Sequence, residues 1–228
     1  MQPIDMKDAF DSLRDNPDVR YAAKHPVESH FGLNGIFQCD VYRPRKNLKP
    51  GQHFVTDQNG KPIRNPKTGA FLISGGMPEP FPNTFTTEGI ARMLNIMFHD
   101  ISKAGSEIWY VGIYKNNVTP AVGNTASVHL GAAGTYGACQ ATTDFDEEAY
   151  QSYTTADTET ASITNSVAGT ADFTIADTIT IYGAFLGSSS DPTDTTGYLM
   201  SAKKFGSSRS VVDDDAISIT YTISVSTS

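Results

Sequence analysis

Seven cationic side chains gather in one short segment of the chain and could bind an acidic surface. Residues 43–67 hold seven Lys or Arg against the single acid Asp57, which gives the segment a charge of +6. The whole chain has a net charge of −8 and few aromatic residues near this segment, so nucleic acid is not an expected partner. We predict that an acidic protein surface binds the segment, through Arg43, Arg45, Lys46, Lys49, Lys61, Arg64 and Lys67.

Two acidic runs are the candidates for a metal site. They are Asp144-Phe145-Asp146-Glu147-Glu148 and Asp213-Asp214-Asp215. Calcium favours several oxygens on one loop, but neither run has the EF-hand spacing with its glycine. The preferred interpretation is a solvated turn whose charges discourage pairing between sheet edges, with Ca²⁺ as the alternative. We predict no metal site and no cofactor.

Other motifs that could carry chemistry are weak. Gly131, Gly134 and Gly137 form a GxxGxxG without the lysine and hydroxyl of a phosphate-binding loop, which favours a turn. No nucleophile elbow or zinc signature is present in the sequence. The scattered histidines pair with no nucleophile; they are His25, His30, His53, His99 and His129. We predict that the protein is not an enzyme, with paired carboxylates from the acidic runs as the remaining catalytic alternative.

Composition and cysteine spacing restrict the class of protein. Cys39 and Cys139 lie one hundred positions apart, and we predict two buried free thiols in a reducing compartment. The first eight residues lack the basic start and apolar stretch of a secretory signal, which predicts cytosolic synthesis. No apolar run approaches the roughly 20 residues that span a bilayer, and 39% hydrophobic residues exclude compositional disorder.

The first third of the chain differs from the rest. Ten of the twelve prolines in the whole chain precede residue 83. Residues 1–85 carry 11 cationic and 9 acidic side chains, whereas residues 86–228 carry 6 cationic and 16 acidic side chains. Because proline lacks an amide donor, we predict an extended anchoring arm over residues 1–82. Within it we expect a short helix over 5–15, and strands over 36–42 and 70–73 that form a loose ribbon around the basic segment.

A helix is expected next, over residues 87–103. Its apolar residues recur at helical spacing, as Ile90, Met93, Leu94, Met97, Phe98 and Ile101. Thr86 or Thr87 can cap its start, Glu88 suits the positive end of the dipole, and Gly105 can adopt the left-handed cap.

After residue 105 the period of the hydrophobic pattern changes to two. We predict strands over 108–114, 136–145, 161–167, 171–176, 178–186 and 216–225. Strands at intervals of roughly ten residues without a further helix are typical of an antiparallel β-sandwich. The predicted fold class is therefore mainly β, a jelly-roll-like sandwich with one amphipathic helix over residues 83–228, preceded by the Pro-rich arm.

The order of motifs in this second part is informative. The motifs are the helix start Asn83-Thr84-Phe85-Thr86-Thr87-Glu88-Gly89-Ile90-Ala91, the strands Trp109-Tyr110-Val111-Gly112-Ile113-Tyr114 and Ile181-Tyr182-Gly183-Ala184-Phe185-Leu186, the segment Gly197-Tyr198-Leu199-Met200-Ser201-Ala202-Lys203-Lys204-Phe205, and the closing Ile217-Ser218-Ile219-Thr220-Tyr221-Thr222-Ile223. Residues 83–228 thereby resemble a loose group of tailed-bacteriophage virion structural proteins, described as head decoration, head fibre, neck or tail-associated proteins. The resemblance implies a virion role without catalysis and carries over no functional residues.

These observations predict a structural component of a phage virion that is synthesised in the host bacterial cytoplasm. It would decorate or cement the capsid, and its partners would be the major capsid protein or neck and tail proteins, together with further copies of itself in a homo-oligomer. A neck, collar or tail-associated position is an alternative. A receptor- or carbohydrate-binding sandwich is another, in which Trp109, Tyr136, Tyr150 or Tyr153 would stack on sugar rings.

Overall fold

The computed structural model of the chain describes residues 31–74, 81–99, 109–166 and 169–227. Residues 33–224 form one compact unit, and the description below concerns that unit. Its elements, some of which begin or end just outside it, are β1 (Phe31–Arg43), the 3-10 helix η1 (Arg45–Asn47), β2 (Phe71–Leu72), β3 (Phe81–Pro82), β4 (Thr84–Phe85), α3 (Thr87–Phe98), β5 (Tyr110–Tyr114), α4 (Ala126–His129), β6 (Gln151–Ser152), β7 (Ser162–Thr164), β8 (Ala171–Thr174), β9 (Ile179–Gly187), β10 (Leu199–Val211) and β11 (Ala216–Thr227). The helix expected over residues 5–15 lies outside the described residues.

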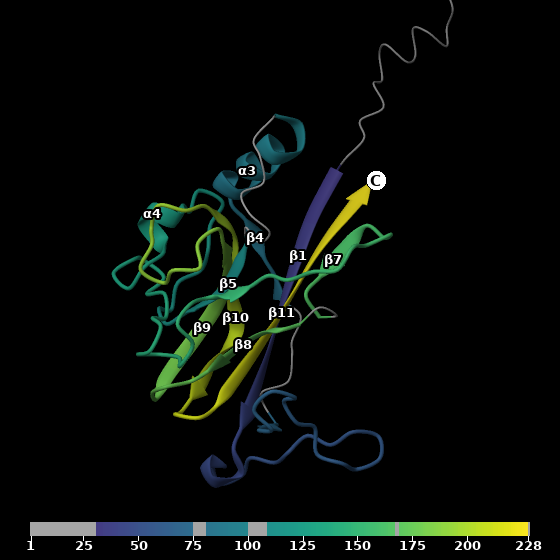
Figure 1. Cartoon of the computed structure of the whole chain (residues 1–228), viewed down its shortest axis with the longest axis vertical. Helices are drawn as coiled ribbons and strands as arrows, with labels where there is room; N and C mark the ends of the chain where they lie inside the picture. The colour runs from purple at the N-terminus through teal and green to yellow at the C-terminus, as the bar shows by residue number, and fades with distance from the viewer. Residues whose placement is uncertain (1–30, 75–80, 100–108, 167–168, 228) are drawn as a thin grey trace, which may run out of the picture. The chain divides into compact units, whose positions relative to one another are not determined.

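The fold is mainly β and consists of two antiparallel sheets, as predicted (Figure 1). The first sheet has the strand order β2-β1-β11-β7, with β3 also pairing with β1 and β8 with β11. The second has the order β4-β10-β9-β5-β6. The β9–β10 and β5–β9 ladders place β9 at the centre of the second sheet, and the aromatic motif of β5 lies between β9 and the edge strand β6.

One hydrophobic core lies between the sheets. Phe37, Cys39 and Val41 of β1 join Ile217, Ile219 and Tyr221 of β11 on the first sheet, and Val111, Ile113 and Phe185 face them from the second. The rings of Phe37 and Tyr221 stack with their centroids 4.1 Å apart. Residues 35, 37, 39 and 41 of β1 and residues 217, 219 and 221 of β11 are all buried, which is the period of two that one core-facing side of a strand requires.

The first turn of helix α3 is fixed to the second sheet. Thr86 Oγ1 accepts a hydrogen bond from the Gly89 amide at 3.0 Å, which confirms the predicted N-cap. Glu88 Oε2 accepts hydrogen bonds from the amides of Ala126 at 2.9 Å and Leu199 at 2.7 Å. Gly89 lies so close to β10 that a Cβ there would be 2.3 Å from Met200 Cα. The start of the helix therefore cannot move away from β10 without losing these contacts.

The far end of α3 differs from the prediction. The helix ends at Phe98 because His99 is extended, with φ −135° and ψ 110°. The expected cap at Gly105 lies outside the described residues. Leu94, Met97 and Phe98 are 46%, 61% and 78% exposed. The apolar stripe therefore packs on the body only in its first half.

Two strand predictions need correction. Residues 136–145 form turns with isolated bridges rather than a strand, because Gly137 and Thr142 both have φ 58°, which breaks an extended backbone. Strand β10 was missed by the sequence analysis. Its residues 199–202 are all buried, because the core covers one face of the strand and the start of α3 covers the other. A strand that is buried on both faces shows no alternation of apolar and polar residues.

The prediction that residues 1–82 form an extended arm is wrong for β1 and β2. β1 is a 13-residue strand that pairs with β11 inside the first sheet, and its Phe37 and Cys39 side chains are fully buried. The predicted ribbon is confirmed, because β1 and β2 pair antiparallel with Tyr42 opposite Leu72. Prolines flank these strands but do not interrupt them, so this part of the chain belongs to the body.

Candidate functional site

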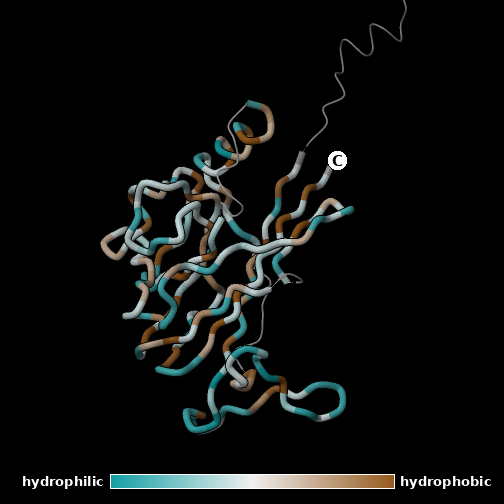
Figure 2. Tube along the Cα trace, in the orientation of Figure 1, coloured by the Kyte–Doolittle hydropathy of each residue, from teal (hydrophilic) through white to brown (hydrophobic). Residues whose placement is uncertain are grey.

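The basic segment forms a folded excursion between β1 and β2, which we call the basic excursion (residues 44–70). Its chain doubles back on itself through amide-to-carbonyl hydrogen bonds from Val55 to Leu72, from Ile63 to Val55 and from Leu72 to Ile63, each 2.9 Å long. Gly60 and Gly69, at φ 76° and 70°, each take a positive φ that suits a turn. Figure 2 shows that most of its trace is hydrophilic.

A small second core supports the excursion. Tyr42, Ala70, Leu72 and Ala216 are buried together, with Val55 and Ile63 packed against them. The ring of Phe54 also stacks on that of Phe71, with centroids 4.3 Å apart. These contacts link the excursion to β1, β2 and the start of β11. The basic excursion is therefore a structured part of the body.

A buried ion pair joins the base of the excursion to the turn between β10 and β11. Arg43 Nε donates to both carboxylate oxygens of Asp215 at 2.9 Å, and Nη2 adds a third bond to Oδ2. Nη1 donates to Gln52 Oε1 at 2.7 Å and Nη2 also reaches the Ser210 carbonyl at 3.3 Å. Both charged side chains are fully buried. The predicted role of Arg43 as a surface contact is therefore wrong, because its guanidinium is enclosed and used.

Two further ion pairs connect the excursion to the body from its surface. Lys46 Nζ lies 2.5 Å from Asp214 Oδ2, and both side chains are exposed. Lys67 Nζ lies 2.8 Å from Asp172 Oδ2, a carboxylate that is 8% exposed. Together with the Arg43–Asp215 pair these contacts form what we call the clamp. The acidic run 213–215 forms a turn in which Asp214 has φ 66°. Two of its three carboxylates therefore form ion pairs with cationic side chains of the same chain.

Four of the predicted cations lie on the surface of the excursion without a carboxylate partner among the described residues. They are Arg45, Lys49, Lys61 and Arg64. The Arg64 guanidinium lies 4.0 Å from the centroid of the Phe71 ring, which holds its charge over an aromatic face. Because the clamp already neutralises the other three cations, these four supply the positive field of the excursion.

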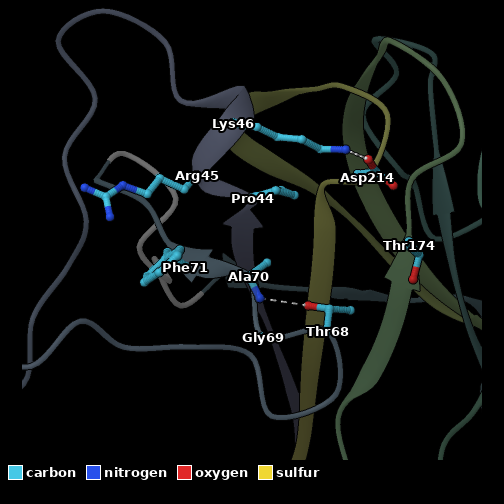
Figure 3. Close-up of a pocket in the computed structure, with 9 residues that line it drawn as sticks. All are labelled: Pro44, Arg45, Lys46, Thr68, Gly69, Ala70, Phe71, Thr174 and Asp214. Carbon is cyan, nitrogen blue, oxygen red and sulfur yellow. Dashed lines mark hydrogen bonds and ion pairs between the residues drawn. The ribbon is translucent and has the colours of Figure 1, made fainter.

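A concave surface of about 420 Å³ lies between the excursion and the body (Figure 3). It is lined by Pro44, Arg45, Lys46, Thr68, Gly69, Ala70, Phe71, Thr174 and Asp214. Figure 3 shows the Lys46 side chain reaching across to Asp214, while the Arg45 side chain points away from that contact. The surface is thus bordered by one neutralised cation and one cation that remains available to a partner.

The second acidic run is also used inside the molecule. Asp144 is buried and accepts hydrogen bonds from Lys115 Nζ at 2.8 and 2.9 Å and from the Gln140 amide at 2.7 Å. Glu147 accepts a hydrogen bond from the Thr174 amide at 2.9 Å. Across the part of the chain that the structure describes, no group of three His, Cys, Asp or Glu side chains is arranged to hold a metal ion.

The glycine motif and the cysteines behave as predicted. Gly131 and Gly137 take positive φ values of 78° and 58°, and the Gly134 amide donates to the Gly131 carbonyl, so the motif is a turn. Cys39 and Cys139 are buried free thiols. Burial raises the pKa of the Cys39 thiol to about 12, which removes it from thiolate chemistry at neutral pH.

The aromatic residues named for sugar stacking lie in or against the core. Tyr136 and Tyr150 are buried, and their hydroxyls donate to Asn124 Oδ1 and to the Cys139 carbonyl. Tyr153 is half-buried and donates to the Ile163 and Tyr221 carbonyls. Trp109 packs against the core as well. Tyr136 and Tyr150 therefore cannot form a sugar platform, which corrects that expectation.

Comparison of the chain with protein-family models, with curated proteins and with solved structures yields no match. None of the helices formed by the described residues has the length and apolar character needed to cross a membrane. The features of the chain that bear on function are therefore the clamp, the exposed cations of the basic excursion and the sequence motifs.

Proposed function

We propose that the chain is a non-enzymatic structural component of a tailed-phage virion that decorates or cements the capsid. In this proposal the basic excursion, rather than a long flexible arm, docks on an acidic surface of the major capsid protein. The sequence motifs of residues 83–228 support the virion assignment through their resemblance to such proteins. Placement at the neck or on the tail is the alternative, with a neck or tail protein as partner.

The observation that carries the anchoring role is the clamp. Arg43, Lys46 and Lys67 bind carboxylates of the same chain and hold the excursion in place. Arg45, Lys49, Lys61 and Arg64 remain for a partner. A preformed cationic surface loses less conformational entropy on binding than a flexible arm does, and its field accelerates encounter with an acidic partner.

Copies of the chain associate with one another in this proposal through the exposed end of α3. Leu94, Met97 and Phe98 place three large apolar side chains at the surface. A symmetric assembly such as a capsid presents neighbouring copies to this face. Sedimentation of the double variant Met97→Ser, Phe98→Ser should show a smaller species than the unaltered chain; an unchanged distribution would remove α3 from the contact.

The anchoring proposal is tested by charge reversal. Particles grown without this protein are mixed with the purified chain, and the bound copies are counted after sedimentation. Reversal of Lys49 and Lys61 to Glu should reduce binding at least tenfold, and the residual binding should fall further with added salt. Reversal of Lys203 and Lys204 on β10 makes the same charge change outside the excursion and is the control, with its folding checked by circular dichroism because both residues are half-buried. Equal effects of the two reversals would contradict docking through the excursion.

The virion assignment has its own test, which does not depend on the excursion. Immunogold labelling of intact particles should place the chain on the capsid. Labels at the neck or tail would select the alternative position. Particles that carry no label at any position would overturn the virion role itself.

A further inference from the structure

A second concave surface is lined by Gln52 and Ser210, which both accept hydrogen bonds from Arg43, and its lining has an unusual chemistry. It has a volume of about 210 Å³ and is lined by Val41, Lys49, Gln52, Ile73, Ser74, Ser208, Arg209 and Ser210. The lining residues come from β1, the basic excursion, the residues that follow β2, and β10. Two cations, one amide and three hydroxyls surround an apolar floor, and no Asp or Glu lines the surface. We call it the donor socket.

The amide of Gln52 is oriented by its neighbours so that its donors are left over. Its Oε1 accepts hydrogen bonds from Arg43 Nη1 at 2.7 Å and from the Lys49 amide at 3.0 Å. No described residue accepts from its Nε2 group, which has two N–H donors. The fully buried Arg43 therefore has a second effect. It occupies the Gln52 Oε1 acceptor, so that the Nε2 donors of the same amide are available to a ligand in the socket.

The charges around the socket leave an excess of one cation. Arg43 is neutralised by Asp215, and Arg209 is near Asp40 on β1. Lys49 is exposed and has no carboxylate partner among the described residues. Ser208 and Ser210 are exposed too, and they line the socket together with Lys49. A ligand that accepts hydrogen bonds and carries one or two negative charges fits this lining.

We propose that the donor socket binds the carboxylate of an acidic side chain from the partner protein. This inference rests on the proposed function, since it names the point at which the basic excursion recognises its partner. A carboxylate offers acceptors only, which matches a lining made of donors, and the volume is suited to one side chain rather than to a folded ligand. Val41 and Ile73, both buried, would contact its methylene groups.

The test uses a fluorescein-labelled peptide of alternating glycine and glutamate, and its glutamine counterpart as the neutral control, with the full-length chain at low ionic strength. The anisotropy titration should show binding of the glutamate peptide only. Lys49→Glu should weaken that binding at least tenfold. Lys61→Glu makes the same charge change on the excursion but outside the socket, and it should weaken the binding less than about threefold. Ser208→Ala with Ser210→Ala should weaken it without altering charge.

Several results would overturn the inference. Equal effects of Lys49→Glu and Lys61→Glu would mean that the peptide responds only to the overall positive charge of the excursion and does not bind in the socket. Binding of inorganic phosphate that depends on Lys49, without binding of the glutamate peptide, would assign the socket to a free anion. Normal incorporation of Lys49→Glu into particles, while the joint reversal of Arg45, Lys61 and Arg64 abolishes it, would remove the socket from docking and leave the proposed function intact.

Discussion

β1 and the basic excursion follow one another in the sequence but are held in place by different forces. β1 buries Phe37, Cys39 and Val41 between two sheets, so apolar burial fixes it. The excursion has only a small core of its own and depends on pairing between cations and carboxylates more than a hundred residues away. Composition alone does not separate these cases, because both segments lie in the proline-rich and cation-rich part of the chain.

The largest effect should come from removing β1. Deletion of residues 1–80 takes away β1, one of the two inner strands of the first sheet, and should expose Tyr221 and Ile219 of β11. We expect the truncated chain to show no cooperative unfolding transition in urea, monitored by circular dichroism. A truncated chain that unfolded cooperatively with the midpoint of the full chain would mean that β1 is an attached arm after all.

A smaller but still large loss is expected at the link between the two regions. Arg43→Ala leaves Asp215 buried without its partner, which should lower the free energy of unfolding by about 3–5 kcal/mol. Lys46→Ala, which removes the exposed ion pair of the same clamp, should leave the urea midpoint nearly unchanged. If both variants unfolded at the same urea concentration, the clamp would not depend on burial.

The weakest of these effects concerns a charge that β1 itself carries. Burial raises the pKa of the Asp40 carboxyl to about 6, with the nearby Arg209 opposing the shift. The folded state therefore disfavours the ionised form, and the contribution of Asp40 to the free energy of unfolding falls as the pH rises from about 4 to about 6. Asp40→Asn should remove this loss and raise the free energy of unfolding at pH 7.5 by about 1 kcal/mol, after allowance for the partial exposure of the group.

The measurement is urea unfolding of Asp40→Asn and of the unaltered chain at pH 4 and at pH 7.5. The gain should appear only at the higher pH. Asp146→Asn, which changes an exposed carboxylate outside β1, is the matched control. A gain of the same size at pH 4 would show that the effect does not come from ionisation of Asp40.

The sequence predicted those parts of the fold in which one physical signal dominates. β9 and β11 follow from near-perfect alternation of apolar residues in the sequence, and the start of α3 follows from helical spacing and from the Thr86 cap. It failed where tertiary contacts override local pattern. Residues 199–202 of β10 have no alternation because the start of α3 covers their outer face. The backbone of residues 136–145 turns at Thr142, a residue type that rarely adopts positive φ.

The candidate site was predicted as a charge distribution but not as a structure. All seven cations were identified, yet their spacing did not separate Arg43, which is enclosed, from Arg45 two residues later, which is exposed. The signal that could have separated them is the position of Arg43 at the end of a strand, combined with the three consecutive Asp residues before β11. Gln52 and the serines of the donor socket carry no charge pattern, so nothing in the sequence marked them.

The most direct test of a preformed excursion is hydrogen–deuterium exchange on the isolated chain, read at the amides of Val55 and Ile63 in the excursion and of Leu72 in β2. These amides donate the bonds that fold the excursion on itself. If the clamp and the small core hold it in place without a partner, the three amides should exchange many times more slowly than an unstructured peptide, and Arg43→Ala should abolish that protection. Exchange at the unstructured rate in the unaltered chain would contradict a preformed docking surface.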